Sequence, residues 1–290
     1  MEQYLNRFLE SLAAEKGYSD NTIAAYLNDL NQFADFLRQP RSRGPVSEPG
    51  QITTEMLNDY LGDMRGRGYA SATLARKVAA IKSFFHFLNA QGLIPSNPAV
   101  GLESPKIEKR LPRILTLEEI ERLLAAPSQA VGPKALRDRA LLELLYATGM
   151  RVTEVVSLKL SDLDLDKGTI TCRGKHDKQR LIPFSGETAL VAVREYLLRS
   201  RPGLIKEPGE AALFLNHRGQ KLTRQGLWLI IKAYAGAAGI SAEVTPHTLR
   251  HSFAKHTLNK GEDMKRLQEL LGHANLSTTL VYTQMETPSQ

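Results

Sequence analysis

Two arginines of this 290-residue chain follow signals that start helices, and a histidine accompanies one of them. In the segment TPHTLRHSF, Thr245 and Pro246 are typical of a helix cap and a first helical residue. His247 and Arg250 are three residues apart, so both project from one face of that helix near its N-terminus. Because the first turn of a helix presents unpaired backbone N–H groups, this corner favours an anion.

The second arginine has a similar setting. In the segment ATGMRVTE, Gly149 is typical of a helix end, and Arg151 falls in the first turn of the helix that follows. Two guanidinium groups can together hold the non-bridging oxygens of one phosphate through paired hydrogen bonds. The two arginines therefore indicate a site for a phosphate group.

Four segments together carry a family resemblance. The segments ATGMRVTE, GKHDKQRLIPF, HTLRHSFA and LGHANLSTTLVYT resemble, in order and spacing, the catalytic boxes of the tyrosine recombinases and specifically of their Xer branch. The segment NTIAAYLNDLNQFADFL is similar to the core-binding domain of the same family, so the resemblance covers nearly the whole chain. The sequence lacks the N-terminal arm-site module common in phage integrases, which favours resolution of chromosome or plasmid dimers over phage integration.

The resemblance implies a catalytic centre of six side chains that bind a phosphate, move protons and attack phosphorus. These side chains are Arg151, Lys175, His247, Arg250, His273 and Tyr282.

In the reaction of that family, a tyrosine oxygen attacks a DNA phosphodiester and leaves a 3′-phosphotyrosine and a free 5′-hydroxyl. The resemblance gives this role to Tyr282. Because the covalent intermediate keeps the energy of the broken bond, the strand can be rejoined through a Holliday junction without ATP. Arg151, Arg250 and an N–H of His273 would stabilise the negative charge of the transition state.

Two further residues would move protons. The resemblance assigns protonation of the departing 5′-oxygen to Lys175, and a role as base or proton relay near the tyrosine to His247. No metal or other cofactor is expected. His247 and His251 are four residues apart like a pair of zinc ligands, but a third ligand is not evident. The single Cys172 is typical of a small buried side chain.

The periodicity of apolar residues predicts a mainly α-helical fold with a small antiparallel β-sheet. The first hundred residues have the pattern of a four-helix bundle. A proline-rich segment without periodicity, residues 94–115, follows as an extended linker. We therefore predict a helical core-binding domain of the SAM-like type over residues 1–106 and an α+β catalytic domain over residues 107–290. Within the latter, residues 163–184 alternate and predict two β-hairpins.

Charge and hydropathy point to a nucleic-acid partner and a cytoplasmic location. Residues 1–100 hold ten basic and ten acidic side chains, whereas residues 101–290 hold 28 against 21, so the excess of positive charge belongs to the second part. No apolar run reaches the roughly 18 residues that a membrane span needs. The first helix contains acids and is unlike a signal peptide.

The expected partner is a double-stranded DNA core site, bound by a homo- or hetero-tetramer that can include a paralogous recombinase. A DNA translocase is a further possible partner. Arg76, Lys77 and Lys82 are predicted to contact DNA phosphates from the first domain. Two alternatives stay open from the sequence. One is an enzyme that relaxes DNA like a type IB topoisomerase, and the other is a catalytically silent DNA-binding protein on the same scaffold.

The role of Lys175 generates a chemical test. Lys175→Ala is expected to cleave an ordinary site very slowly, because an alkoxide leaves poorly without a proton. A site with a 5′-bridging sulfur should be cleaved nearly as fast as by the unaltered protein, since a thiol of pKa about 8.5 departs as a thiolate. The measurement is the rate of covalent adduct formation. Arg250→Ala is the control, which sulfur should not rescue, and failure to rescue Lys175→Ala would redirect the acid role to His176 or Lys178.

Overall fold

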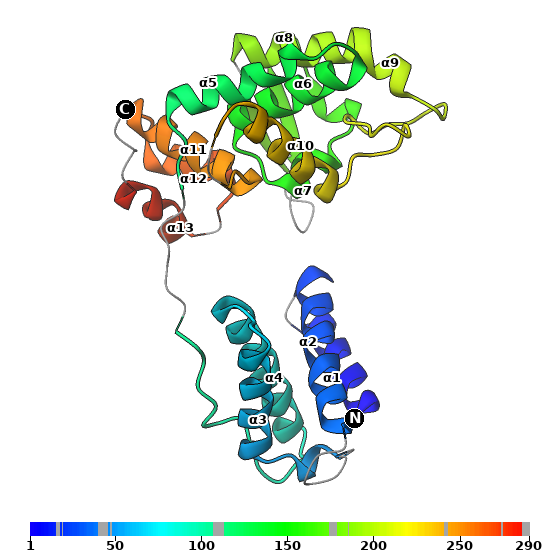
Figure 1. Ribbon diagram of the computed structural model, residues 1–290, viewed down its shortest axis with the longest axis vertical. Coiled ribbons are helices and arrows are strands. Elements are labelled where there is room, and N and C mark those ends of the chain that lie inside the picture. The colour runs from blue at the N-terminus through cyan, green and yellow to red at the C-terminus, as the bar shows by residue number, and fades with distance from the viewer. Residues whose placement is uncertain are drawn as a thin grey trace. The chain divides into compact units, whose positions relative to one another are not determined.

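The computed structural model of the chain describes residues 1–15, 18, 20–39, 46, 48–106, 113–173, 179–184, 186–240, 243–273 and 275–285 (Figure 1). The chain divides into two compact units, Met1–Arg110 and Leu111–Gln290. Each unit has a hydrophobic core of its own. The mainly α-helical fold with a small antiparallel sheet is confirmed.

The first unit is built on four long helices, as the sequence predicts. They are α1 (Glu2–Glu15), α2 (Asp20–Arg38), α3 (Thr54–Gly66) and α4 (Ser71–Ala90), with a short 3-10 turn η1 (Pro49–Gln51) before α3. Their apolar faces meet in a core rich in aromatic rings. For example, Phe33 packs against Tyr60 with ring centroids 5.2 Å apart, and Phe8 packs against Phe84 at 5.5 Å. This burial is what stabilises helices whose apolar residues recur at helical spacing.

A buried ion pair joins α2 to α4 inside this bundle. The side chain of Lys77 is 1% exposed. Its Nζ lies 3.0 Å from Asp29 Oδ1 and 2.7 Å from Gln32 Oε1. The structure therefore contradicts the predicted phosphate contact of Lys77, because its charge is used within the core. The sequence places Lys77 one residue after Arg76 on a basic helix, but the helical turn directs it inward. Arg76 also binds Asp29 yet is 40% exposed, so its contact with DNA stays a prediction, as does that of Lys82.

The described part of the second unit contains nine α-helices, and the long helix α6 (Pro133–Thr148) is the central one. The others are α5 (Leu117–Ala125), α7 (Val152–Ser157), α8 (Glu187–Glu195), α9 (Arg201–Leu204), α10 (Arg224–Ala237), α11 (Pro246–Asn259), α12 (Met264–Leu271) and α13 (Leu276–Leu280). Shorter turns are η2 (Ala126–Gln129), η3 (Leu160–Asp162), the π-turn η5 (Tyr196–Ser200) and η6 (Val281–Gln284). Buried residues on all sides of α6 show that it lies inside the unit.

The sheet has three antiparallel strands in the order β1 (Leu163–Asp164), β2 (Thr169–Arg173) and β3 (Gln179–Pro183). Ile170 pairs with Ile182, and both are fully buried, so one face of the sheet covers the core. Residues 174–178, which connect β2 to β3 in the sequence and include Lys175, lie outside the described residues. No helix in the part of the chain that the structure describes combines the length and the apolar character needed to cross a bilayer.

The buried ion pair generates a stability prediction. Asp29→Ala leaves the Lys77 ammonium in the core without its carboxylate, which should lower the free energy of unfolding by roughly 3–5 kcal/mol. Asp35→Ala is the matched control on the same helix, because Asp35 is 67% exposed and its pair with Arg38 lies at the surface. That control should change stability by less than about 1 kcal/mol. Urea unfolding followed by circular dichroism measures both, and equal effects would contradict a structural role for the pair.

Candidate active site

Four segments that lie far apart in the sequence meet at one place in the second unit. They are the junction of α6 and α7, the first turns of α11, the end of α12 and the turn η6. Of the six predicted catalytic residues, the structure brings Arg151, Arg250, His273 and Tyr282 together. His247 lies one turn from Arg250 on α11, with its side chain exposed.

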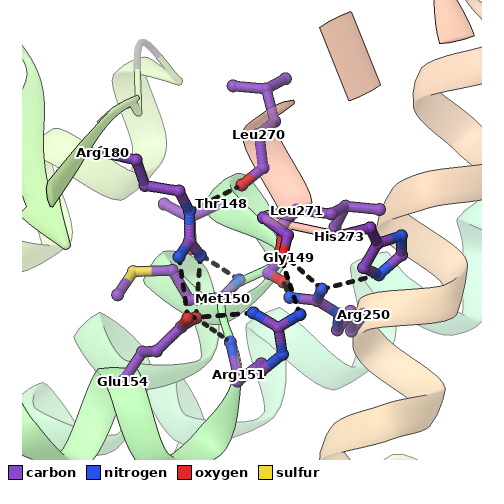
Figure 2. A network of polar contacts seen from close by, with 11 residues as sticks. Thr148, Gly149, Met150, Arg151, Glu154, Arg180, Arg250, Leu270, Leu271 and His273 are labelled. Atoms are coloured by element: carbon purple, nitrogen blue, oxygen red, sulfur yellow. Dashed lines mark hydrogen bonds and ion pairs between the residues drawn. The ribbon is translucent and has the colours of Figure 1, made fainter. Parts of the chain in front are cut away.

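Arg250 is the most deeply buried charge of this site, at 5% exposure. Its Nη1 donates to the carbonyl oxygen of Gly149 at 2.6 Å, and its Nη2 donates to the carbonyl of Leu271 at 2.7 Å and to Nε2 of His273 at 2.9 Å (Figure 2). Burial, followed by repulsion from the charge of Arg151, lowers the pKa of Arg250 to about 10. The guanidinium is therefore still a cation at pH 7, held by neutral acceptors.

Arg151 is held differently. It precedes α7 as its cap residue, and its backbone N–H donates to Glu154 Oε2 at 2.7 Å. Its Nη1 donates to Glu154 Oε1 at 3.1 Å, and its Nη2 donates to the carbonyl of Gly272 at 2.9 Å. The side chain is 39% exposed. The two arginines thus bind consecutive carbonyls at the end of α12, and Arg151 remains open to a ligand.

Glu154 and Arg180 belong to this network, although the sequence analysis did not single them out. Arg180 on β3 donates from Nη1 and Nη2 to the two carboxylate oxygens of Glu154, at 2.8 and 2.9 Å, and from Nε to the carbonyl of Leu270 at 3.3 Å. Burial opposes ionisation of Glu154, but hydrogen bonds from Arg180 and from the N–H of Arg151 outweigh it and lower the pKa of this carboxyl. A Glu three residues after a helix cap was the available signal for Glu154.

Two glycines allow the network to close. Gly149 ends α6 and Gly272 ends α12, both in the left-handed region with φ of +58° and +63°. A Cβ on Gly149 would lie 2.2 Å from the ring of Phe253, and a Cβ on Gly272 would lie 2.9 Å from the guanidinium of Arg180. Neither position has room for a side chain, and both backbone conformations are costly for other residues.

His273 has both ring nitrogens engaged. Because an arginine can only donate, Nε2 accepts from Arg250, and the proton of the neutral ring is on Nδ1, which donates to Thr279 Oγ1 at 2.9 Å. Burial, followed by the charges of Arg250 and Arg151, lowers the pKa of His273 to about 4. In this arrangement His273 is a neutral partner that orients Arg250.

Tyr282 lies against this centre at 3% exposure. Its ring stacks on that of His273, with centroids 6.2 Å apart and planes 18° from parallel. Burial raises the pKa of Tyr282, and the charges of Arg250 and Arg151 oppose that effect. Its hydroxyl lies 3.1 Å from Nδ1 of His251, a residue that the sequence analysis considered only as a zinc ligand.

Histidines 247 and 251 do not form a metal site with other described residues. No group of three or more His, Cys, Asp or Glu side chains in the described ranges is arranged to hold a metal ion. The two rings stack with centroids 6.3 Å apart. Burial, and then the charges of His247 and Arg250, lower the pKa of His251 to about 4, so it is neutral at pH 7.

Comparison with known proteins gives the family. Residues 113–288 match the model of the phage integrase family, and residues 5–92 match the N-terminal SAM-like domain of phage integrases. The chain belongs to the phage integrase family. It is a Xer-type tyrosine recombinase, an enzyme that breaks and rejoins DNA in site-specific recombination.

Relatives of this recombinase carry both Xer names. It is 48% identical to tyrosine recombinase XerC of Herpetosiphon aurantiacus, over 98% of this chain and 90% of the relative. It is 45% identical to tyrosine recombinase XerD of Halalkalibacterium halodurans, over 96% and 92%. Among solved structures, XerH recombinase bound to palindromic difH substrate, in a post-cleavage complex, matches with a TM-score of 0.73 and 25% identity, over 97% of this chain and 91% of that one.

The close approach at Gly272 generates a prediction for the recombinase. Gly272→Ala should lower the free energy of unfolding by more than about 1–2 kcal/mol, because strain at positive φ adds to displacement of Arg180 from Glu154. The rate of DNA cleavage should fall with it. Gly236→Ala is the control: this residue lies in α10, with nothing within 4 Å of an added Cβ, and should be stabilised by about 0.5–1 kcal/mol. Thermal unfolding and adduct formation measure both variants. Unchanged stability in Gly272→Ala would contradict the close approach of Gly272 to Arg180.

Proposed function

We propose that Tyr282 is the nucleophile of this recombinase and that Arg151 and Arg250 hold the phosphate it attacks. The observation that carries the proposal is the meeting of a buried tyrosine with two guanidiniums of distant segments, Arg250 being bonded only to neutral groups among its described contacts. A phosphodiester bound at this site would give Arg250 the negatively charged partner that its described contacts do not provide. The same charge grows in the transition state, so the arginines favour reaction as well as binding.

The two arginines have different hydrogen-bond partners before a phosphate binds. The guanidinium of Arg151 is bonded to the carboxylate of Glu154, so it can turn toward a phosphate at the cost of one partly buried ion pair. Arg250 is fixed by three acceptors and would act without rearrangement. His273 would keep Arg250 in that plane, because its Nε2 accepts a hydrogen bond from the guanidinium.

Lys175 is proposed as the acid for the departing 5′-oxygen. Support comes from the family match and from the sequence position of Lys175 between β2 and β3, the second of which carries Arg180. The ion pair of Arg180 with Glu154 joins that strand to α7, directly beside Arg151. We keep residues 1–106 as the core-binding domain and residues 107–290 as the catalytic domain, with Arg76 and Lys82 as phosphate contacts of the former.

The proposed partner is a double-stranded DNA core site, bound as a tetramer. The XerH match supports a DNA site, since that structure holds the recombinase on its difH substrate. Nearly equal identities to relatives named XerC and XerD fit either four copies of this chain or a pair of paralogues. Resolution of chromosome or plasmid dimers in the cytoplasm, with help from a DNA translocase, is the biological role we propose.

The nucleophile is tested by Tyr282→Phe. We expect this variant to bind DNA with near-normal affinity, because affinity comes from phosphate contacts elsewhere, but to form no SDS-resistant adduct. Adducts and four-way junctions are measured on candidate core sites by gel electrophoresis. An adduct formed by Tyr282→Phe would contradict the assignment. Relaxation of unpaired supercoiled plasmid without junctions would instead favour topoisomerase activity.

A further inference from the structure

The proton of the Tyr282 hydroxyl must leave when the oxygen attacks phosphorus, and the site offers few groups to receive it. Both nitrogens of His273 are occupied, one by Arg250 and the other by Thr279. His247 is exposed, and among the described residues the hydroxyl of Tyr282 contacts a different imidazole. That imidazole is His251, whose Nδ1 lies 3.1 Å from the hydroxyl oxygen.

We propose that His251 is a catalytic residue that takes the proton of Tyr282 during cleavage and returns it during rejoining. The inference rests on the proposed function, because it requires Tyr282 to be the nucleophile. The hydrogen bond sets the direction of transfer. An ordinary tyrosine hydroxyl donates, so Nδ1 of His251 is the acceptor and Nε2 of the neutral ring carries the proton.

The step balances without a cofactor. The bond from Tyr282 Oη to phosphorus forms as the bond from phosphorus to the 5′-oxygen breaks. The phenol proton passes to His251 Nδ1 and makes an imidazolium, while the departing 5′-oxygen takes a proton from the acid on its own side. In rejoining, the 5′-hydroxyl attacks the phosphotyrosine, and His251 gives its proton back to the tyrosine oxygen.

The surroundings of His251 keep it ready to accept. His247 and Arg250 face it from its own helix, Tyr282 from η6, and His273 from the segment after α12. Burial, followed by the electrostatic effects of His247 and Arg250, lowers the pKa of His251 to about 4, so a lone pair is free at pH 7. A phosphodiester beside Arg250 adds negative charge, which raises the basicity of His251 when DNA is bound.

The test is the pH dependence of a single turnover on a DNA core site that the unaltered protein cleaves. His251→Gln keeps a polar side chain but cannot take up a proton. We expect adduct formation to be about 100-fold slower near pH 7 and to rise roughly tenfold per pH unit up to about pH 9, because hydroxide must then ionise the tyrosine. The unaltered protein should show a much flatter profile, because its base is already neutral. His217→Gln is the control, since His217 is an exposed histidine of the same unit, and it should keep the unaltered profile.

Replacement of Tyr282 by a fluorotyrosine gives a second readout. Fluorine lowers the pKa of the phenol, so it should accelerate His251→Gln by a larger factor than the protein that retains His251. DNA affinity and thermal unfolding verify that the variant is folded, and His251→Asn serves in its place if His251→Gln is not. A purely structural role for His251 would not produce this selective rescue.

Two results would overturn the proposal. One is an unchanged cleavage rate in a folded His251→Gln protein. The other is a slower rate with an unchanged pH profile and no selective gain from fluorotyrosine, which would make His251 a packing residue. Failure of the proposed function gives a different result: no adduct from the unaltered protein, or an adduct that survives Tyr282→Phe.

Discussion

The site depends on one buried cation. Arg250 lies inside the second unit, and three neutral acceptors from α6, α12 and His273 hold its guanidinium. Burying a charge is costly unless hydrogen bonds satisfy it, and these bonds require the ends of two helices to converge on one side chain. The positions of Gly149 and Leu271 follow from that requirement. The same bonds leave the charge of Arg250 uncompensated by a direct carboxylate among its described contacts, which suits a phosphate ligand.

A second charge network connects the sheet to this centre. Glu154 accepts hydrogen bonds from both Nη atoms of Arg180 and from the backbone and side chain of Arg151. One carboxylate therefore joins β3, α7 and an arginine of the site. Such a buried pair holds each partner in place, because removal of either leaves an uncompensated charge. Gly272 passes close to Arg180 at the point where α12 ends. Strand β3 is therefore joined to the start of α7, directly beside Arg151.

The histidines of the site differ in role because their surroundings differ. His247 and His251 lie one turn apart on α11, yet one is exposed and the other is held against the tyrosine. Burial among cations makes His251 and His273 neutral at pH 7, so each can accept a hydrogen bond from a stronger donor. The direction of these hydrogen bonds is set by their partners. Arg250 can only donate to His273, and Tyr282 donates to His251.

Local chemistry in the sequence determined the elements and most of the reactive groups. Apolar spacing, Thr and Pro at helix starts and Gly at helix ends were sufficient for the four-helix bundle, the small sheet and the helix-end setting of Arg151 and Arg250. The family resemblance added His273 and Tyr282, because their spacing to each other has a meaning only within a known pattern. These features are readable because caps and periodicity act over a few residues.

Only the tertiary structure decided which side chains touch. It turned Lys77 into the bundle to meet Asp29, whereas its position in a basic helix had suggested a DNA contact. It brought Arg180 to Glu154 across 26 residues of sequence and His251 to Tyr282 across 31. No local pattern encodes such pairs, because burial and long-range packing choose the partner of each polar group after the helices are formed. The sequence therefore pointed to the tyrosine, and the folded chain showed which imidazole lies within hydrogen-bond distance of its hydroxyl.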